Sequence, residues 1–257
     1  MHVHLHILGL HIPMYGLMIV IGVAVANIVA VKIKKNYSFD INDFIILQAY
    51  VFLFAFLFAK ILYLFTIINQ IEFDKIFDIN YLNTLIQGGF VFYGGLIGGF
   101  FGLYVAGKIH KIDYMMYLRH NIFLLPLAHA FGRIGCFCAG CCYGRECSGP
   151  FCVVFPLNSF AKPLVPLFPI QLLESFILFV LAISLYLYQK RKGVGYSIEI
   201  YIVSYSIIRF ILEYFRGEVE RGSVYIFSTS QIISIALLLI VLIRYVIISK
   251  KQKAKSK

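Results

Sequence analysis

Long apolar stretches alternate with short polar ones along most of this chain. Seven windows are long and apolar enough to cross a bilayer, at residues 12–31, 44–68, 86–106, 118–137, 170–188, 196–212 and 229–248. A transmembrane helix needs about 20 mostly apolar residues, so this pattern predicts an all-α, polytopic membrane helix bundle with about seven spans. Glycines interrupt the third window, and Arg119, His120 and Pro126 interrupt the fourth. We therefore expect a broken or re-entrant segment in one or both.

Residues 138–169 form the longest stretch outside these windows and contain five of the seven prolines. Interior proline breaks the hydrogen bonding of a helix, so we expect a short irregular extracytoplasmic cap with one or two short strands or turns. The first window has no basic stretch before it and no small-residue cleavage site after it, which favours a true span over a signal peptide. Residues 1–257 are expected to form a single integral membrane domain that ends in a basic cytoplasmic tail at about 249–257.

Composition agrees with a membrane protein, because 61% of the residues are hydrophobic and only 14% are charged. A net charge of +11 would also fit a nucleic-acid-binding protein, but the position of the charges argues against one. Most of the 23 basic residues lie in alternate loops, at 32–35, 108–119, 190–192 and 244–257. Because cytoplasmic loops collect Lys and Arg, this bias predicts an extracytoplasmic N-terminus and a cytoplasmic C-terminus. We expect a membrane and no nucleic acid as partner.

Two arginines inside apolar windows are the strongest candidates for chemistry, since an ionisable residue in hydrocarbon is costly and marks a functional site by default. Arg133 lies in the fourth window, and Arg209 in the sixth shares one helix face with Glu213 and Arg216. An ion pair within the protein would use Glu213 and one arginine, and it would leave a second arginine without a carboxylate partner. Bidentate recognition of a phosphate by guanidinium is the favoured interpretation, with Glu174 as a competing partner for Arg133.

Small residues in the third window are spaced so that another helix or a ligand can approach the backbone closely. Helix packing by Gly94, Gly95 and Gly98 is the simpler interpretation, while the nearby Tyr93 favours an anionic lipid headgroup. Lys60, near the end of the second window, has two interpretations of equal weight. It either extends to the membrane interface or contacts a ligand.

All six cysteines fall between Cys136 and Cys152. In an oxidising loop they are expected to form disulfides, and in a reducing setting they would be packed thiols or metal ligands. The pair Cys138 and Cys141 has a spacing typical of zinc or redox sites, but the adjacent Cys142 is awkward for a closed tetrahedral site. The sequence leaves these alternatives open.

Histidines alternate with apolar residues at the N-terminus, at His2, His4, His6 and His11. This period of two fits a short extended segment better than a metal site. His129 lies one turn before Arg133 and is either structural or a proton acceptor.

Six segments together resemble one family, the prolipoprotein diacylglyceryl transferases of bacterial membranes. In order, they are Tyr15-Gly16-Leu17-Met18, Ala59-Lys60-Ile61-Leu62-Tyr63, the glycine-rich segment from Gln87 to Gly98, Gly132-Arg133-Ile134-Gly135 with the later Gly140 and Gly144, Pro169-Ile170-Gln171-Leu172-Leu173-Glu174, and the segment from Arg209 to Arg216. Four departures mark a divergent, cysteine-rich branch. Tyr93 replaces a histidine of the family, Cys136 an asparagine, Ala139 an asparagine and Cys141 a glutamate.

The resemblance implies a transferase of the bacterial plasma membrane. It would move the diacylglyceryl group of phosphatidylglycerol to the lipobox cysteine thiol of a prolipoprotein, releasing glycerol phosphate without a metal or diffusible cofactor. Arg133 and Arg209 would bind the phosphate, Tyr15 and Tyr93 would make polar contacts or handle the proton, and Glu213 would orient the arginines. The remaining residues expected to bind or line the substrate site are Lys60, Gly94, Gly95, Gly98, Cys136, Gly144, Gln171, Glu174 and Arg216.

Two alternatives remain. The first is a related membrane transferase that moves a lipid or lipid-phosphate unit to a different acceptor. The second is a non-enzymatic lipid- or metal-binding membrane protein that uses the cysteine-rich loop.

Overall fold

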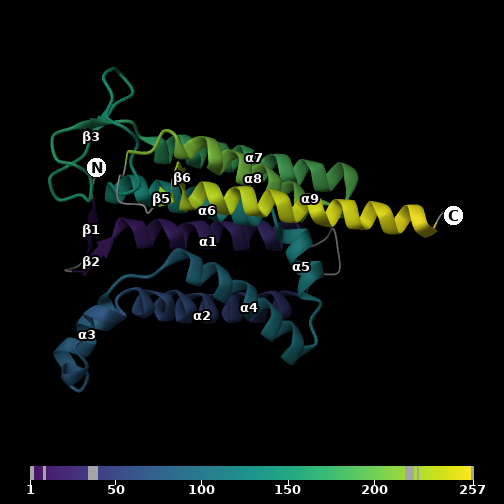
Figure 1. The fold of residues 1–257 in the computed structure, drawn as a ribbon, viewed down its shortest axis with the longest axis horizontal. Helices are drawn as coiled ribbons and strands as arrows, with labels where there is room; N and C mark the ends of the chain where they lie inside the picture. The colour runs from purple at the N-terminus through teal and green to yellow at the C-terminus, as the bar shows by residue number, and fades with distance from the viewer. Residues whose placement is uncertain (1–2, 8–9, 34–39, 218–222, 225, 256–257) are drawn as a thin grey trace. The chain divides into compact units, whose positions relative to one another are not determined.

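The computed structural model describes residues 3–7, 10–33, 40–217, 223–224 and 226–255 (Figure 1). The chain divides into two compact units. The first comprises Met1–Ile33 with Leu118–Lys257, and the second comprises Lys34–Tyr117.

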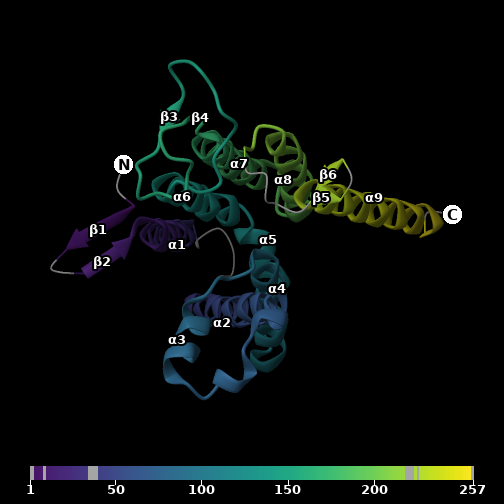
Figure 2. The ribbon, with the colours of Figure 1, turned by 60° about the vertical axis from the view of Figure 1, so that its left-hand side comes forward.

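A row of packed helices forms the first unit. Their bounds are Met14–Ile33 for α1, Leu124–Ala139 for α6, Ile170–Lys192 for α7, Ser197–Glu213 for α8 and Thr229–Lys255 for α9. Each packs on the next in the order α1, α6, α7, α8, α9, as Figures 1 and 2 show from two sides. Gly22 and Gly135 allow α1 and α6 to approach closely, since a Cβ at Gly135 would lie 3.1 Å from the carbonyl oxygen of Tyr15. The hydroxyl of Ser175 on α7 donates to the carbonyl of Ala130 on α6 at 2.9 Å.

The second unit is built on a close helix pair, α2 (Ile41–Thr66) and α4 (Phe92–His110), with the short helix α3 (Ile79–Gln87) between them in sequence. Gly94, Gly98 and Gly102 of α4 are buried against the backbone of α2. A Cβ at Gly94 would lie 2.5 Å from the carbonyl oxygen of Phe58, and one at Gly102 would lie 2.5 Å from that of Tyr50. Only glycine permits this approach, so helix packing accounts for the glycine spacing.

Within the described ranges, five helices are long and apolar enough to cross a membrane, namely α1, α2, α4, α7 and the Thr229–Ile247 part of α9. A sixth span is α5 (Tyr114–Asn121) together with α6, if the pair, bent by 60°, is counted as one. This break confirms the expectation that the fourth window is not one regular helix. The remaining predicted window is α8, whose 17 residues extend about 26 Å. The all-α membrane bundle is confirmed, with five or six candidate spans among the described residues where the sequence predicted about seven.

Two short 3₁₀ helices, η2 (Ile68–Gln70) and η3 (Phe73–Lys75), follow α2. Short antiparallel strand pairs make up the rest of the regular structure in the described part of the chain. They are β1 (His4–Ile7) with β2 (Leu10–Pro13), β3 (Val153–Val154) with β4 (Pro166–Leu167), and β5 (Ser223–Val224) with β6 (Phe227–Ser228). The first pair confirms the extended N-terminal segment, with His6 opposite His11 in register. His2 lies outside the described residues. The β3–β4 pair confirms the irregular cap with short strands.

Candidate active site

Glu174 of α7 is the centre of a buried charge cluster in the first unit. Its side chain is 1% exposed, and its two oxygens face two different arginines. Nη2 of Arg216 donates to Oε2 of Glu174 at 2.9 Å. Nε of Arg133 lies 3.0 Å from Oε1, an ion pair that is not aligned as a hydrogen bond. The sequence identified Glu174 as a competing partner for Arg133, but it did not indicate the sharing with Arg216.

A second carboxylate, Glu213, pairs with Arg209 one helical turn before it, with Oε2 of Glu213 2.8 Å from Nη2 of Arg209. The same Nη2 donates to the hydroxyl of Ser230 at the start of α9, also at 2.8 Å. Nε of Arg216 lies 3.9 Å from Glu213. The cluster therefore joins α6, α7, α8 and α9 through five ionic side chains and one hydroxyl.

The positive charge of this cluster exceeds the negative charge. Over the described residues, the three guanidinium groups of Arg133, Arg209 and Arg216 face the two carboxylates of Glu174 and Glu213. Nη1 of Arg209 and Nη1 of Arg216 are buried and have no hydrogen-bond partner within the described part of the chain. Buried polar groups in proteins are almost always hydrogen-bonded, so each exception calls for a ligand or a function. Unpaired guanidinium donors are suited to an oxyanion such as phosphate.

Aromatic side chains surround the charge cluster. His129 of α6 and Tyr205 of α8 pack at a ring-centroid distance of 5.6 Å, and both interact electrostatically with Arg133 and Glu174. Tyr15 of α1 interacts electrostatically with Arg133. Tyr15 and His129 were predicted from the sequence as candidate residues, whereas Tyr205 and Ser230 were not. Tyr205 had a signal, because it lies four residues before Arg209 on the same helix face.

Gly144 lies where three segments of backbone cross. Its N–H donates to the carbonyl of Phe168 at 2.9 Å, and it forms an isolated β-bridge with Arg216. A Cβ at Gly144 would lie 2.6 Å from the Phe168 carbonyl oxygen. Gln171, at the start of α7, donates to the carbonyl of Cys141 at 2.8 Å. Both residues were predicted to line the substrate site. In the structure, the backbone of Gly144 holds the segment of Arg216, and the side chain of Gln171 holds the cysteine turn.

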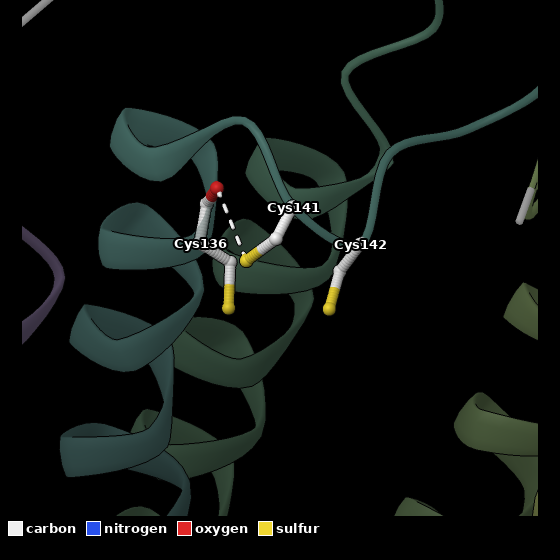
Figure 3. A group of neighbouring side chains, drawn as sticks. All are labelled: Cys136, Cys141 and Cys142. Carbon is white, nitrogen blue, oxygen red and sulfur yellow. Dashed lines mark hydrogen bonds between the residues drawn. The ribbon is translucent and has the colours of Figure 1, made fainter. Parts of the chain in front are cut away.

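Five of the six cysteines fall into two groups, and Cys138 is a thiol outside both. Cys147 and Cys152 form a disulfide in the cap, as expected for an oxidising loop. Cys136, Cys141 and Cys142 remain thiols whose sulfur atoms all lie within 4.8 Å of one another (Figure 3). The pKa of the Cys141 thiol is raised, mainly by hydrogen bonding with the thiols of Cys136 and Cys142 and to a smaller extent by burial. Of the alternatives considered from the sequence, the disulfide interpretation therefore applies to only part of the loop.

Lys60 belongs to the second unit, where its ammonium group holds a turn. It donates to the carbonyls of Ile86 at 3.1 Å, Gly88 at 3.2 Å and Gly89 at 3.5 Å. The ring of Tyr63 lies 4.6 Å from the same ammonium group. Two of the segments that carried the resemblance are thus joined directly, through a contact that the sequence analysis did not predict.

Tyr93, Gly94, Gly95 and Gly98 also belong to the second unit. The ring of Tyr93 contacts that of Phe92 at a centroid distance of 5.8 Å. Gly94 and Gly98 pack on α2, and a Cβ at Gly95 would lie in ordinary contact with Ala59 at 3.7 Å. The structure therefore brings the predicted residues together in two groups, one within each unit.

A cavity of about 440 Å³ lies between α8 and α9, and Glu199 and Arg244, which line it, form an ion pair at 3.4 Å. Glu199 precedes Arg209 on α8 by ten residues, or about 15 Å along the helix. This cavity is therefore separate from the charge cluster.

This chain is similar to known proteins along nearly its whole length. A family model described as prolipoprotein diacylglyceryl transferase matches residues 2–247. A phosphatidylglycerol–prolipoprotein diacylglyceryl transferase 2 of Clostridium perfringens is 35% identical over 234 residues, which cover 91% of this chain and 90% of that protein. The corresponding enzyme of Clostridium tetani is 35% identical over 234 residues, covering 90% of this chain and 91% of its own. That of Pasteurella multocida is 30% identical over 238 residues, covering 88% and 84%.

Proposed function

Since the chain belongs to the prolipoprotein diacylglyceryl transferase family, we propose that it transfers the diacylglyceryl group of phosphatidylglycerol to the lipobox cysteine of a prolipoprotein. The observation that carries this proposal is the excess of buried guanidinium donors around Glu174 and Glu213. A multi-pass bundle with such donors suits a reaction whose lipid substrate carries a phosphate.

The reaction moves one carbon from oxygen to sulfur. The acceptor sulfur forms a bond to the glyceryl carbon, the bond from that carbon to the phosphate oxygen breaks, and glycerol phosphate leaves with the electron pair. Negative charge therefore grows on the phosphate in the transition state. Hydrogen-bond donors that are already oriented toward this charge lower the barrier without reorganising during the reaction.

Each charged side chain has a part in this proposal. Arg133 and Arg209 bind the phosphate, with the unpaired Nη1 of Arg209 as an available donor. Glu213 orients Arg209 through the 2.8 Å contact, and Glu174 does the same for Arg133 and Arg216. Tyr15, beside Arg133, makes polar contacts or handles the proton of the acceptor thiol.

The predicted residues of the second unit form a group of their own, for which we propose separate roles. Tyr93 makes polar contacts or handles the proton, as proposed for Tyr15. Lys60, Gly94, Gly95 and Gly98 shape the region that admits the lipid headgroup.

The proposed location is the bacterial plasma membrane, with the N-terminus extracytoplasmic and the C-terminus cytoplasmic. Two features support this orientation. The basic residues at 32–35, 108–119, 190–192 and 244–257 are grouped in alternate loops. The disulfide between Cys147 and Cys152 lies in a loop on the opposite side, where the surroundings are oxidising.

A transfer assay tests the function. The purified protein is mixed with phosphatidylglycerol vesicles and a peptide that carries a lipobox cysteine, and the diacylglyceryl thioether is measured by mass spectrometry. We expect product from the wild-type chain and at least a hundredfold less from Arg209→Ala. Arg244→Ala is the matched control, because Arg244 lies at the far end of the α8–α9 pair. Equal rates for Arg209→Ala and the wild type would contradict the proposal.

A further inference from the structure

Three thiols meet at the point where α6 ends. Cys136 lies in the last turn of the helix, and Cys141 and Cys142 lie in the turn that follows it. We propose that Cys136, Cys141 and Cys142 form a binding site for one thiophilic metal ion of the zinc class, with three thiolate ligands and an open fourth position. From the sequence, disulfides, packed thiols and metal ligands all remained open for the cysteines, and the family resemblance implied a reaction without a metal.

The backbone of this turn is shaped to bring the sulfur atoms together. Gly140 has φ of 74° and Cys142 has φ of 59°, so two of three consecutive residues are left-handed. A non-glycine residue in this region is strained, and such strain concentrates at functional sites. The turn folds back on the helix, where the N–H of Cys141 donates to the carbonyl of Cys136 at 3.1 Å. Figure 3 shows the three sulfur atoms on one side of the turn, pointing back along α6.

The turn is also held from outside. Gln171 donates to the carbonyl of Cys141 at 2.8 Å, which ties the middle of the turn to α7. The next residues cross the Arg216 segment at Gly144. Ligands fixed by surrounding hydrogen bonds are typical of metal sites, because these contacts orient the donor atoms before the metal binds.

The distances suit a metal better than a disulfide. All three sulfur atoms lie within 4.8 Å of one another, and thiolates around tetrahedral zinc are about 3.8 Å apart, given zinc–sulfur bonds of about 2.3 Å. A metal ion uses all three thiols after a small contraction, whereas a disulfide uses two and leaves one.

The open position follows from the ligand count. Among the described residues, the group contains three ligands and no fourth histidine, cysteine or carboxylate. Zinc sites with three protein ligands keep a position for water or substrate, whereas structural sites have four. The expected exogenous ligand is a thiol, because a thiolate is the best match for a soft site.

The binding of the acceptor thiol at the open position rests on the proposed function, and it supplies the nucleophile of that reaction. When the acceptor thiol coordinates the metal, its sulfur–metal bond forms and its proton is released to water, since a coordinated thiol is deprotonated. The metal-bound thiolate then attacks the glyceryl carbon, and the carbon–oxygen bond to the phosphate breaks. The thioether that forms is a weaker ligand and leaves the metal.

Metal analysis of the purified full-length protein tests the site. The protein is loaded with Zn²⁺ or Co²⁺, desalted, and analysed by mass spectrometry of the metal and by the sulfur-to-cobalt charge-transfer bands. We expect about one ion per chain and at least a tenfold loss of bound metal in Cys142→Ser. Cys138→Ser is the matched control, because this cysteine is in the same stretch and outside the group.

Three results would overturn the site. They are less than a tenth of an equivalent of metal on the folded wild type, equal metal content in Cys142→Ser and Cys138→Ser, or a disulfide between any two of the three cysteines. Thermal melting of each variant shows whether it is folded, and Cys136→Ser provides a second test of the same group. Neither readout depends on transferase activity, so the site and the proposed function fail separately.

A peptide titration tests the open position. The cobalt-loaded protein is titrated with a lipobox peptide that has one cysteine, and with the same peptide carrying serine. We expect the cobalt absorption to change with the cysteine peptide alone. The same spectrum with both peptides would show a closed site and overturn the role of the metal in holding the acceptor.

Discussion

Arg216 and Glu174 are joined by a 2.9 Å hydrogen bond between side chains that are 3% and 1% exposed. The two residues are 42 positions apart in the chain, so this pair fixes the segment after α8 against the first turns of α7. Arg133 approaches the other oxygen of the same carboxylate. Glu174 is therefore the counter-ion of two buried cations, and its removal leaves Arg216 with only the more distant Glu213, at 3.9 Å, and takes from Arg133 its ion-pair partner among the described residues.

Glu174→Gln is expected to destabilise the fold strongly. The substitution preserves side-chain volume and removes the charge shared by Arg133 and Arg216. Breaking a buried ion pair by removing one partner costs about 3–5 kcal/mol, because the remaining charge stays buried. Thermal or denaturant unfolding in detergent measures the loss.

Glu146→Gln is the control for Glu174→Gln. Glu146 pairs with Lys162 at 3.0 Å, but both side chains are about half exposed. Exposed pairs contribute about 0–1 kcal/mol, so this variant should melt close to the wild type. Equal melting temperatures for the two variants would contradict the counter-ion role of Glu174.

Arg209→Lys is expected to fold and to lose activity. Lysine keeps the positive charge near Glu213 but lacks the planar fork, so it does not contact Glu213, Ser230 and a phosphate in the same arrangement. We expect the rate of diacylglyceryl transfer to fall about 10²–10³-fold, as for the loss of one donor to a developing oxyanion. Full activity of Arg209→Lys would show that only the charge matters there.

Gly102→Ala is expected to disturb the α2–α4 pair, whereas Gly99→Ala should not. A Cβ at Gly102 would lie 2.5 Å from the carbonyl oxygen of Tyr50, and the neighbouring backbone cannot give way. A Cβ at Gly99 would meet only the side chain of Val51 at 3.6 Å, an ordinary contact. Overpacking typically lowers the free energy of unfolding by about 1–3 kcal/mol. The melting temperatures of the two variants measure the difference between them. A lower stability for Gly99→Ala than for Gly102→Ala would refute this packing.

Lys60→Met is expected to loosen the turn at Gly88 and Gly89. The variant removes the ammonium group that bonds three backbone carbonyls, while Lys60→Arg retains a cation with several donors. Hydrogen exchange of the amides at 86–90 should become about tenfold faster in Lys60→Met, which corresponds to about 1.4 kcal/mol of local opening. Unchanged exchange in Lys60→Met would mean that the carbonyl contacts do not hold the turn.

The helices were predictable because hydrophobic windows of about 20 residues have few other interpretations. The break between α5 and α6 was also predictable, since polar residues and Pro126 interrupt that window. The division into two units was not, because it depends on which helices contact one another and not on hydropathy. The first helix begins at Met14, two residues after the predicted window, because residues up to Pro13 belong to the N-terminal strand pair.

The residues of the charge cluster could be predicted from the sequence. The ion pairs that they form with one another were harder to predict. Arg133 and Arg209 stand out against apolar neighbours, and Glu213 follows Arg209 by one helical turn. The pairing of Arg216 with Glu174 depends on a long-range backbone crossing, which no local pattern reveals. The thiol group was missed for a related reason. The sequence spacing indicated Cys138 as the neighbour of Cys141. In the structure, the turn with a left-handed backbone at Cys142 brings Cys141 and Cys142 close to Cys136. The chemical roles of these residues remain predictions.

The crossing at Gly144 separates the part of the cap that is free to vary from the part that is not. Main-chain hydrogen bonds join Gly144 and Arg145 to Phe168 and Phe215, and the N–H of Cys147 bonds the carbonyl of Pro166 just beyond them. The segment between these points, residues 148–165, is also anchored in its middle, because Phe155 is buried and the N–H of Phe160 donates to the carbonyl of Ala139 at 3.1 Å. Since lengthening a surface loop costs little free energy, only the exposed parts of this segment, on either side of that anchor, can change in length and sequence without shifting Arg216. Insertions are therefore expected to be tolerated beside exposed residues such as Phe151 and Leu164 and not beside Phe155.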